Sequence, residues 1–179
     1  MARKIVLKTP LRDLEKIHHT ADENLKDLKE ILTNIRYEGK AALGKNLKAA
    51  AKVFDFLNGD LRSHIETEEN ALFPFLEKHI PKLEPIIRLL CSEHEDFRKS
   101  LQGFECALRE LSDEKSGQER GKSLEKLNEQ GTYLIYLLRN HIQAEAEGVY
   151  KVADRELKLK EKIELTKRMK FGNRNLLFK

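Results

Sequence analysis

Histidine and glutamate stand four residues apart at two places in the sequence. His64 is followed by Glu68, and His141 is followed by Glu145. Because four residues make about one turn of an α-helix, each imidazole and its carboxylate would project from the same helix face. Imidazole and carboxylate without thiolate suit iron, manganese or zinc. The spacing therefore indicates metal chemistry on two helices.

Two further histidines interrupt apolar stripes of helical spacing. His18 falls between Leu14 and Ala21, and His94 falls between Leu90 and Phe97. A single histidine on an apolar face is more often an ordinary core residue, and a His/Glu pair is often a surface interaction. Burying all of these groups in one core without a cation would leave two negative charges poorly compensated. The combination therefore predicts a metal centre.

Two inward carboxylates on different helices can bridge a pair of metal ions. We therefore predict two non-haem iron ions bridged by Glu68 and Glu145, with manganese and zinc as less favoured alternatives. The assignment of each histidine to one ion stays open. The predicted ligands are His18, His64, Glu68, His94, His141 and Glu145.

Other polar residues near these positions receive different interpretations. His19 is expected to be exposed. The alternative that His19 replaces or supplements His18 as a ligand stays open. His79 is expected near a helix C-terminus, facing the helix dipole. Glu69 is expected at the surface, with a hydrogen bond to the centre as the alternative, and Glu147 is excluded. For the tyrosines of the last long segment, ordinary packing is favoured over a hydrogen bond to a bound oxygen ligand: Tyr133, Tyr136 and Tyr150.

Four long segments carry apolar residues at alternating steps of three and four, which is typical of one helix face turned to a core. They cover about residues 11–35, 45–76, 83–111 and 124–152. In the second segment, Asn58-Gly59 leaves the apolar phase unchanged, which favours one continuous helix, and Pro74 is expected to kink its last turns. The fold class is therefore predicted to be all-α, an up-down-up-down four-helix bundle.

Length and composition agree with this prediction. The 179 residues allow one compact domain, and the composition is 40% hydrophobic and 36% charged with nine glycines and four prolines. We expect an N-terminal extension at 1–10, the bundle at 11–154 and a basic C-terminal extension, partly helical, at 155–179. That last segment carries a net charge of +6, and the remaining 154 residues carry −2.

The same composition excludes several classes of protein. Cys91 and Cys106 lie too far apart on one helix to form a disulfide. No apolar run is long enough to span a bilayer, and no signal peptide is evident, so a soluble cytoplasmic protein is expected. No nucleic-acid binding is expected, since charge runs are usually solvated, but the basic tail could bind a protein partner.

The motifs HIETEENALFP at 64–74 and HIQAE at 141–145 resemble the hemerythrin-like, HHE cation-binding family, and the resemblance covers residues 11–154. It implies a four-helix bundle with a carboxylate-bridged, histidine-ligated di-iron site. Oxygen-carrying members have a second histidine where this chain has Arg98, and a His-x-x-x-x-Asp spacing where it has His141-x-x-x-Glu145. A dedicated oxygen carrier is therefore disfavoured.

The pattern of four histidines and two glutamates is closer to a branch that includes iron-repair, gas-response and iron-sensing proteins. The repair proteins carry an N-terminal cysteine-containing domain that this sequence lacks, so repair activity is not transferred. We expect a di-iron protein that senses or reacts with oxygen, nitric oxide or peroxide. The alternatives are a peroxidase-like enzyme, an oxygen or iron carrier or store, and a metal-free interaction module.

Overall fold

The computed structural model describes residues 11–37, 40–113 and 118–176, and these contain helices and no strand. The first helix, α1 (Arg12–Tyr37), buries residues every three or four positions along one face. Acidic Asp13 and Glu15 lie in its first turn and Arg36 lies in its last, which complements the helix dipole. The predicted end near Gly39 lies outside the described residues.

The second of the four long helical segments runs unbroken from Lys40 to His79, as the apolar phase across Asn58-Gly59 predicts. We call each of these four segments a column, and α1 is the first. Two turns of the second column are wider π-helical turns, which the sequence pattern did not reveal. Ile80 leaves the helical conformation immediately before Pro81, as expected for a residue that precedes proline. Its parts are α2 (Lys40–Phe56), η1 (Leu57–Leu61), α3 (Arg62–Thr67), η2 (Glu68–Leu72) and α4 (Phe73–His79).

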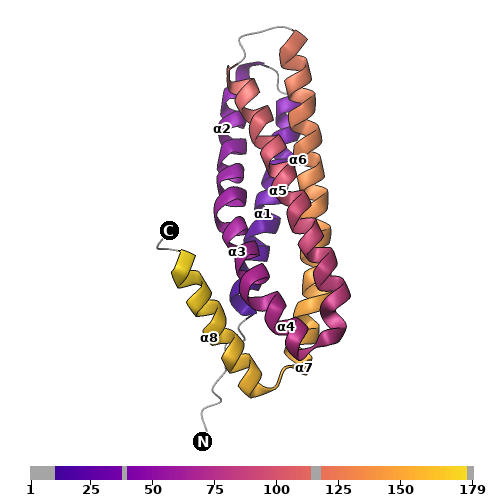
Figure 1. Ribbon diagram of the computed structural model, residues 1–179. Helices are drawn as coiled ribbons and strands as arrows, with labels where there is room; N and C mark the ends of the chain where they lie inside the picture. The colour runs from indigo at the N-terminus through magenta and orange to yellow at the C-terminus, as the bar shows by residue number, and fades with distance from the viewer. Residues whose placement is uncertain (1–10, 38–39, 114–117, 177–179) are drawn as a thin grey trace, which may run out of the picture.

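After the short turn η3 (Pro81–Leu83), the third column is α5 (Glu84–Asp113). The fourth column comprises α6 (Gln118–Glu145), the π-helical turn η4 (Ala146–Tyr150) and α7 (Lys151–Glu156). The third column ends two residues beyond the predicted segment 83–111, and the fourth begins six residues before the predicted segment 124–152. Figure 1 shows α1, α2, α5 and α6 lying alongside one another.

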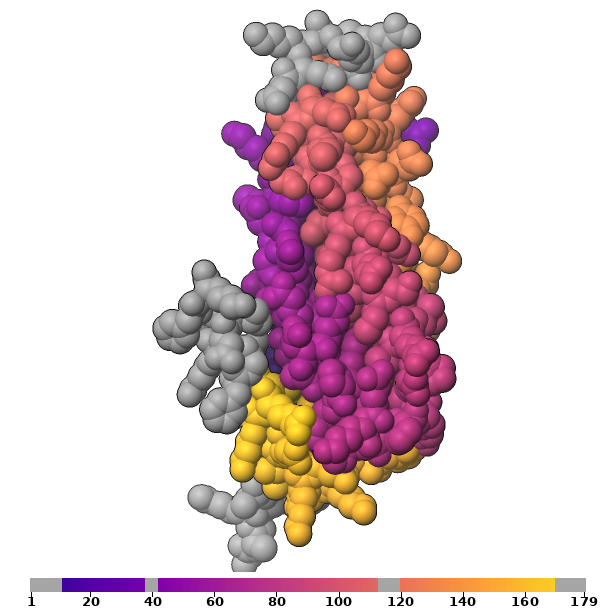
Figure 2. Space-filling view, viewed as in Figure 1, coloured from indigo at the N-terminus to yellow at the C-terminus, as the bar shows by residue number. Residues whose placement is uncertain are grey.

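The basic C-terminal segment forms an additional helix, α8 (Leu159–Leu176), after Leu157 leaves the helical conformation. This helix packs against α3 and η2, beside the lower half of the second column (Figures 1 and 2). Leu165 and Met169 are buried in that contact, and the Arg168 guanidinium lies over the Phe75 ring. The part of the segment around Leu165 and Met169 is therefore packed against the second column.

The apolar core consists of two clusters of buried residues, and each column contributes a different stretch of its length to each cluster. One contains Ala21, Ile65 and Phe97 among its residues, and the other contains Leu14, Leu72 and Leu90. The six predicted ligands lie where one cluster gives way to the other along each column. No helix among the described residues is long and apolar enough to cross a membrane.

Gly131 of α6 packs tightly against α1 and α5. A Cβ atom at this position would lie 2.7 Å from Leu32 Cδ1 and 3.1 Å from Phe104 Cε2. Both neighbours are buried in the core. By contrast, a Cβ atom at Gly44, on the exposed side of α2, would meet nothing within 4 Å.

Gly131→Ala is therefore expected to lower the free energy of unfolding by about 1–3 kcal/mol through overpacking. Gly44→Ala, the matched control, is expected to raise it by about 0.5–1 kcal/mol, because alanine favours the helix more than glycine does. Urea unfolding followed by circular dichroism measures both changes. Equal effects of the two substitutions would show that Gly131 does not set the helix separation.

Candidate metal centre

The six residues predicted as ligands lie together in one buried layer between the two apolar clusters. Glu68 and Glu145 are fully buried, and each of the four imidazoles is at most 6% exposed. We call this group the polar layer, and its members are His18, His64, Glu68, His94, His141 and Glu145. The second, third and fourth columns and α1 all contribute to it.

Each glutamate of the polar layer lies at a change from α- to π-helical geometry. Glu68 is the first residue of η2, and Glu145 is the last residue of α6 before η4. A π-helical turn holds one more residue than the α-helical turn that it replaces, so it shifts the phase of the residues that follow. Such turns occur frequently at functional sites.

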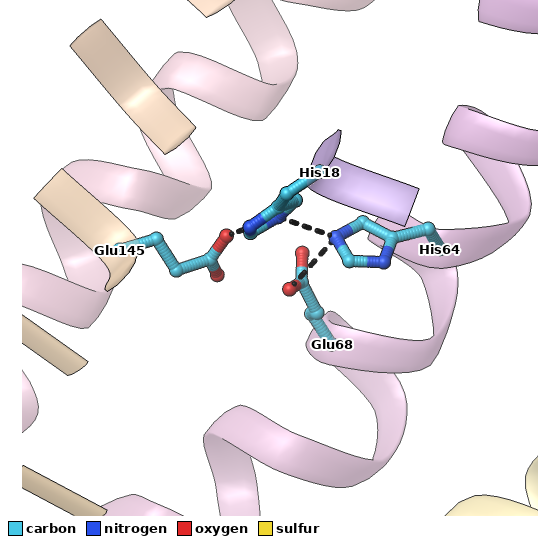
Figure 3. A group of neighbouring side chains, drawn as sticks. All are labelled: His18, His64, Glu68 and Glu145. Carbon is cyan, nitrogen blue, oxygen red and sulfur yellow. Dashed lines mark hydrogen bonds and ion pairs between the residues drawn. The ribbon is translucent and has the colours of Figure 1, made fainter. Parts of the chain in front are cut away.

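His18 and His64 form one half of the polar layer with the two glutamates. His18 Nε2 lies 2.9 Å from His64 Nε2 and 3.0 Å from Glu145 Oε2. His64 Nε2 lies 3.0 Å from Glu68 Oε1. Figure 3 shows these four side chains converging on one point. We call this group, which offers four possible ligand atoms to one ion, the His18 half.

His94 and His141 form the other half. Their Nε2 atoms lie 3.1 Å apart, and His94 Nε2 lies 3.6 Å from Glu68 Oε2. His141 Nε2 lies 3.7 Å from Glu145 Oε2. The residues whose ligand atoms gather closely here are His94, His141 and Glu68, and we call this group the His94 half. Glu68 thus belongs to both halves.

Several buried polar atoms of the layer have no hydrogen-bond partner among the described residues. They are Glu68 Oε2, both carboxylate oxygens of Glu145, and His64 Nδ1. Glu145 Oε2 approaches His18 Nε2 closely without the geometry of a hydrogen bond. Buried carboxylate oxygens are costly when left unsatisfied, and a cation among them would satisfy them.

The separations also suit a metal ion. Nitrogen and oxygen ligands bind such ions at about 2.0–2.2 Å, so neighbouring ligand atoms lie about 3 Å apart. The contacts within the His18 half have this spacing. The residues present therefore fit a metal ion in both chemical type and separation.

Burial and neighbouring groups keep two histidines of the layer, His18 and His94, uncharged. Burial, together with His64, lowers the pKa of His18 to about 3. Burial, together with His141, lowers the pKa of His94 to about 4. A neutral imidazole has a lone pair available, which is the state that metal binding requires. Both side chains are therefore in the binding-competent form at neutral pH.

The pKa values of the two glutamates are shifted in opposite directions. Burial raises the pKa of Glu68, but the His64 imidazole and hydrogen bonds outweigh it and lower that pKa to about 2. Burial, and then the charge of Glu68, raise the pKa of Glu145 well above its usual value. Two neighbouring buried carboxylates cannot both ionise easily without a cation. A metal ion would allow both to be charged.

Three residues around the layer make contacts that sequence reasoning either missed or did not favour. Glu69, expected at the surface, accepts a hydrogen bond from His94 Nδ1 at 3.0 Å. Glu93 accepts one from His141 Nδ1 at 2.8 Å. Tyr150, for which ordinary packing was favoured, donates its hydroxyl hydrogen to Glu68 Oε1 and stacks on the His18 ring. Burial, together with the charge of Glu68, raises the pKa of Tyr150 well above its usual value.

The remaining candidate residues lie outside the layer. His19 is exposed beside Glu23, which resolves the choice between His18 and His19 as the inward-facing histidine. His79 is the last residue of α4, stacks on Phe75 and lies 3.6 Å from Glu161 of α8. Glu147 is exposed and paired with Lys151.

Comparison with known proteins supports the same interpretation. A family model described as the Hemerythrin HHE cation binding domain matches residues 9–153. No match was found among curated proteins or among solved structures. The match spans every residue of the polar layer, and together with this buried cluster it indicates metal binding. The chain belongs to the hemerythrin HHE cation-binding domain family.

Proposed function

We propose that this chain is a di-iron protein that senses or reacts with oxygen, nitric oxide or peroxide. The observation that carries the proposal is the pairing of the imidazoles into two halves that share Glu68. His18 and His64 would hold one iron, and His94 and His141 would hold the other. Glu68 and Glu145 would lie between the two ions.

The chemistry of the donor set favours iron. Imidazole and carboxylate groups without thiolate suit iron, manganese and zinc, and Cys91 and Cys106 belong to neither half. When bound, iron supplies redox chemistry and coordination positions for a small ligand. The protein's own part is to exclude water, to keep the His18 and His94 imidazoles neutral, and to fix Glu68 through the Tyr150 hydroxyl.

The domain organisation forms part of the proposal. Residues 11–154 would constitute an up-down-up-down four-helix bundle, with 1–10 and 155–179 as extensions. The basic extension would serve as the output element of a sensor, because α8 packs on α3 and η2, the segments that carry His64 and Glu68. A protein partner that binds this extension would then respond to the state of the iron.

Removing a ligand tests the site. His18→Ala is expected to reduce iron, measured by elemental analysis after anaerobic loading, from about two ions per chain to roughly one, because the ion in its half loses a ligand. His19→Ala, one position along the same helix but exposed, is expected to retain the full content. Full iron content in the His18→Ala protein would contradict the assignment.

Hydrogen exchange tests the sensing role. Amides of α8 are expected to exchange at different rates in the reduced and the oxidised iron-loaded protein, because α8 contacts the turn that begins at Glu68. Peptides from the first half of α2, which contributes no residue to the polar layer, serve as the internal control. Identical exchange of α8 in both forms would exclude signalling through this helix.

A further inference from the structure

A groove of about 550 Å³ lies between α1 and α6, which pack against each other in the fold. Its volume is within the range of small-molecule sites in proteins. Leu32 of α1 and Ile135 of α6 are buried beneath the groove and give it an apolar base. The described residues that line it include no member of the polar layer, so the groove is a feature separate from the candidate metal centre.

The charge along the walls of this groove is entirely positive. Lys29 and Arg36 line it from α1, and Arg139 lines it from α6. Lys29 and Arg36 are seven residues apart, which is about two helical turns, so they share one face of α1. No aspartate or glutamate is among the described residues that line the groove. A cleft lined by charge of one sign raises the local concentration of the opposite ion.

These three cations are poorly compensated within the protein. Among the described residues, Lys29 and Arg36 have no carboxylate partner. The Nε atom of Arg139 is buried without a hydrogen-bond partner, and it lies 3.8 Å from Asp22 Oδ1. The other oxygen of this carboxylate, Asp22 Oδ2, lies 2.6 Å from Lys26 Nζ. The groove therefore presents positive charge that an external anion could neutralise.

A second groove, of about 330 Å³ between the second column and α5, provides a contrast. Arg62 and Arg98 line it, but so does the Glu105 carboxylate. Arg98 also donates a hydrogen bond to Glu69 at 2.5 Å, and Arg62 Nε lies 3.6 Å from Glu66 Oε1. The cations of that groove already have partners within the protein, so it attracts an anion less strongly.

The remaining polar side chains of the first groove add specificity. Asn128, Tyr136 and Asn140 line it at intervals of eight and four residues along α6, which places them on one face. The Tyr136 side chain is 69% exposed, so the face of its ring is accessible to a planar group. The two amides can both donate and accept hydrogen bonds. Arginine forks bind phosphate oxygens in pairs, and aromatic rings stack on nucleobases.

We propose that the groove between α1 and α6 binds a nucleoside diphosphate. Lys29, Arg36 and Arg139 bind the diphosphate, which carries enough negative charge to engage all three. Tyr136 stacks on the base, and Asn128 and Asn140 bind polar groups of the nucleoside. This site goes beyond the di-iron function proposed above and does not depend on it.

Calorimetric titration of the full chain with ADP and with inorganic pyrophosphate tests the phosphate contacts. The wild-type protein is expected to bind one ADP per chain. Arg36→Gln and Arg139→Gln are each expected to weaken both ligands by about tenfold or more, because each removes charge-assisted hydrogen bonds. Arg109→Gln removes an exposed arginine of α5 outside the groove, and it is expected to leave both affinities unchanged.

A second pair of variants tests recognition of the base. Tyr136→Ala is expected to weaken ADP by about fivefold or more through loss of stacking, and to leave pyrophosphate binding unchanged. Tyr133→Ala, on the same helix but outside the groove, is the matched control and is expected to affect neither ligand. Circular dichroism checks that each variant folds. If Arg139→Gln does not fold, Arg36→Gln still tests the phosphate contacts, because Arg36 is exposed.

Four outcomes would overturn this inference. They are failure of the wild type to bind ADP, unchanged affinity in both arginine variants, and equal effects of Tyr136→Ala on ADP and pyrophosphate. The fourth is single-stranded RNA that binds more tightly than ADP with an affinity that rises with its length, since the groove would then belong to a nucleic-acid surface. None of these results involves iron, so each would leave the proposed function standing.

Discussion

The burial of two carboxylates among four imidazoles is the constraint on which the rest of this structure depends. Each of these groups would be more stable in water than in an apolar core, and several of their atoms have no partner among the described residues. The layer they form divides the apolar core into two clusters. A cation bound among these groups would satisfy the carboxylate oxygens that have no partner.

This constraint acts on the helices that carry the groups. Glu68 and Glu145 both lie at transitions into π-helical turns, and Tyr150, at the end of one such turn, donates its hydroxyl hydrogen to Glu68. Glu69 and Glu93 then connect neighbouring columns through the outer nitrogens of two histidines. Contacts among its own members therefore hold the polar layer together, and the Glu69 and Glu93 carboxylates fix the outer nitrogens of two of its histidines.

Part of this organisation could be predicted from the sequence, because a helical period assigns each residue to a face. The positions of His64 and Glu68 in an apolar stripe indicate that both face the core, and the four-residue spacing places them on one side. The same reasoning favours His18 over His19 as the inward-facing residue but leaves the choice open, and the structure shows that His19 is exposed. The continuity of the second column across Asn58-Gly59 follows from the unchanged apolar phase.

Other features could not be predicted, since they depend on which columns face each other. Helical periodicity favours the surface for Glu69, because its partner, the Nδ1 atom of His94, lies on another column. Tyr150 reaches Glu68 after a π-helical turn that periodicity alone does not reveal. The packing of α8 depends on two apolar residues, Leu165 and Met169, in a segment dominated by charge.

The central claim is that these six residues hold two iron ions. Anomalous diffraction at the iron absorption edge, from crystals of the iron-loaded protein, measures this directly. We expect two anomalous peaks within the polar layer, one beside His18 and His64 and one beside His94 and His141, both adjacent to Glu68. A single peak, or iron bound elsewhere on the chain, would contradict it.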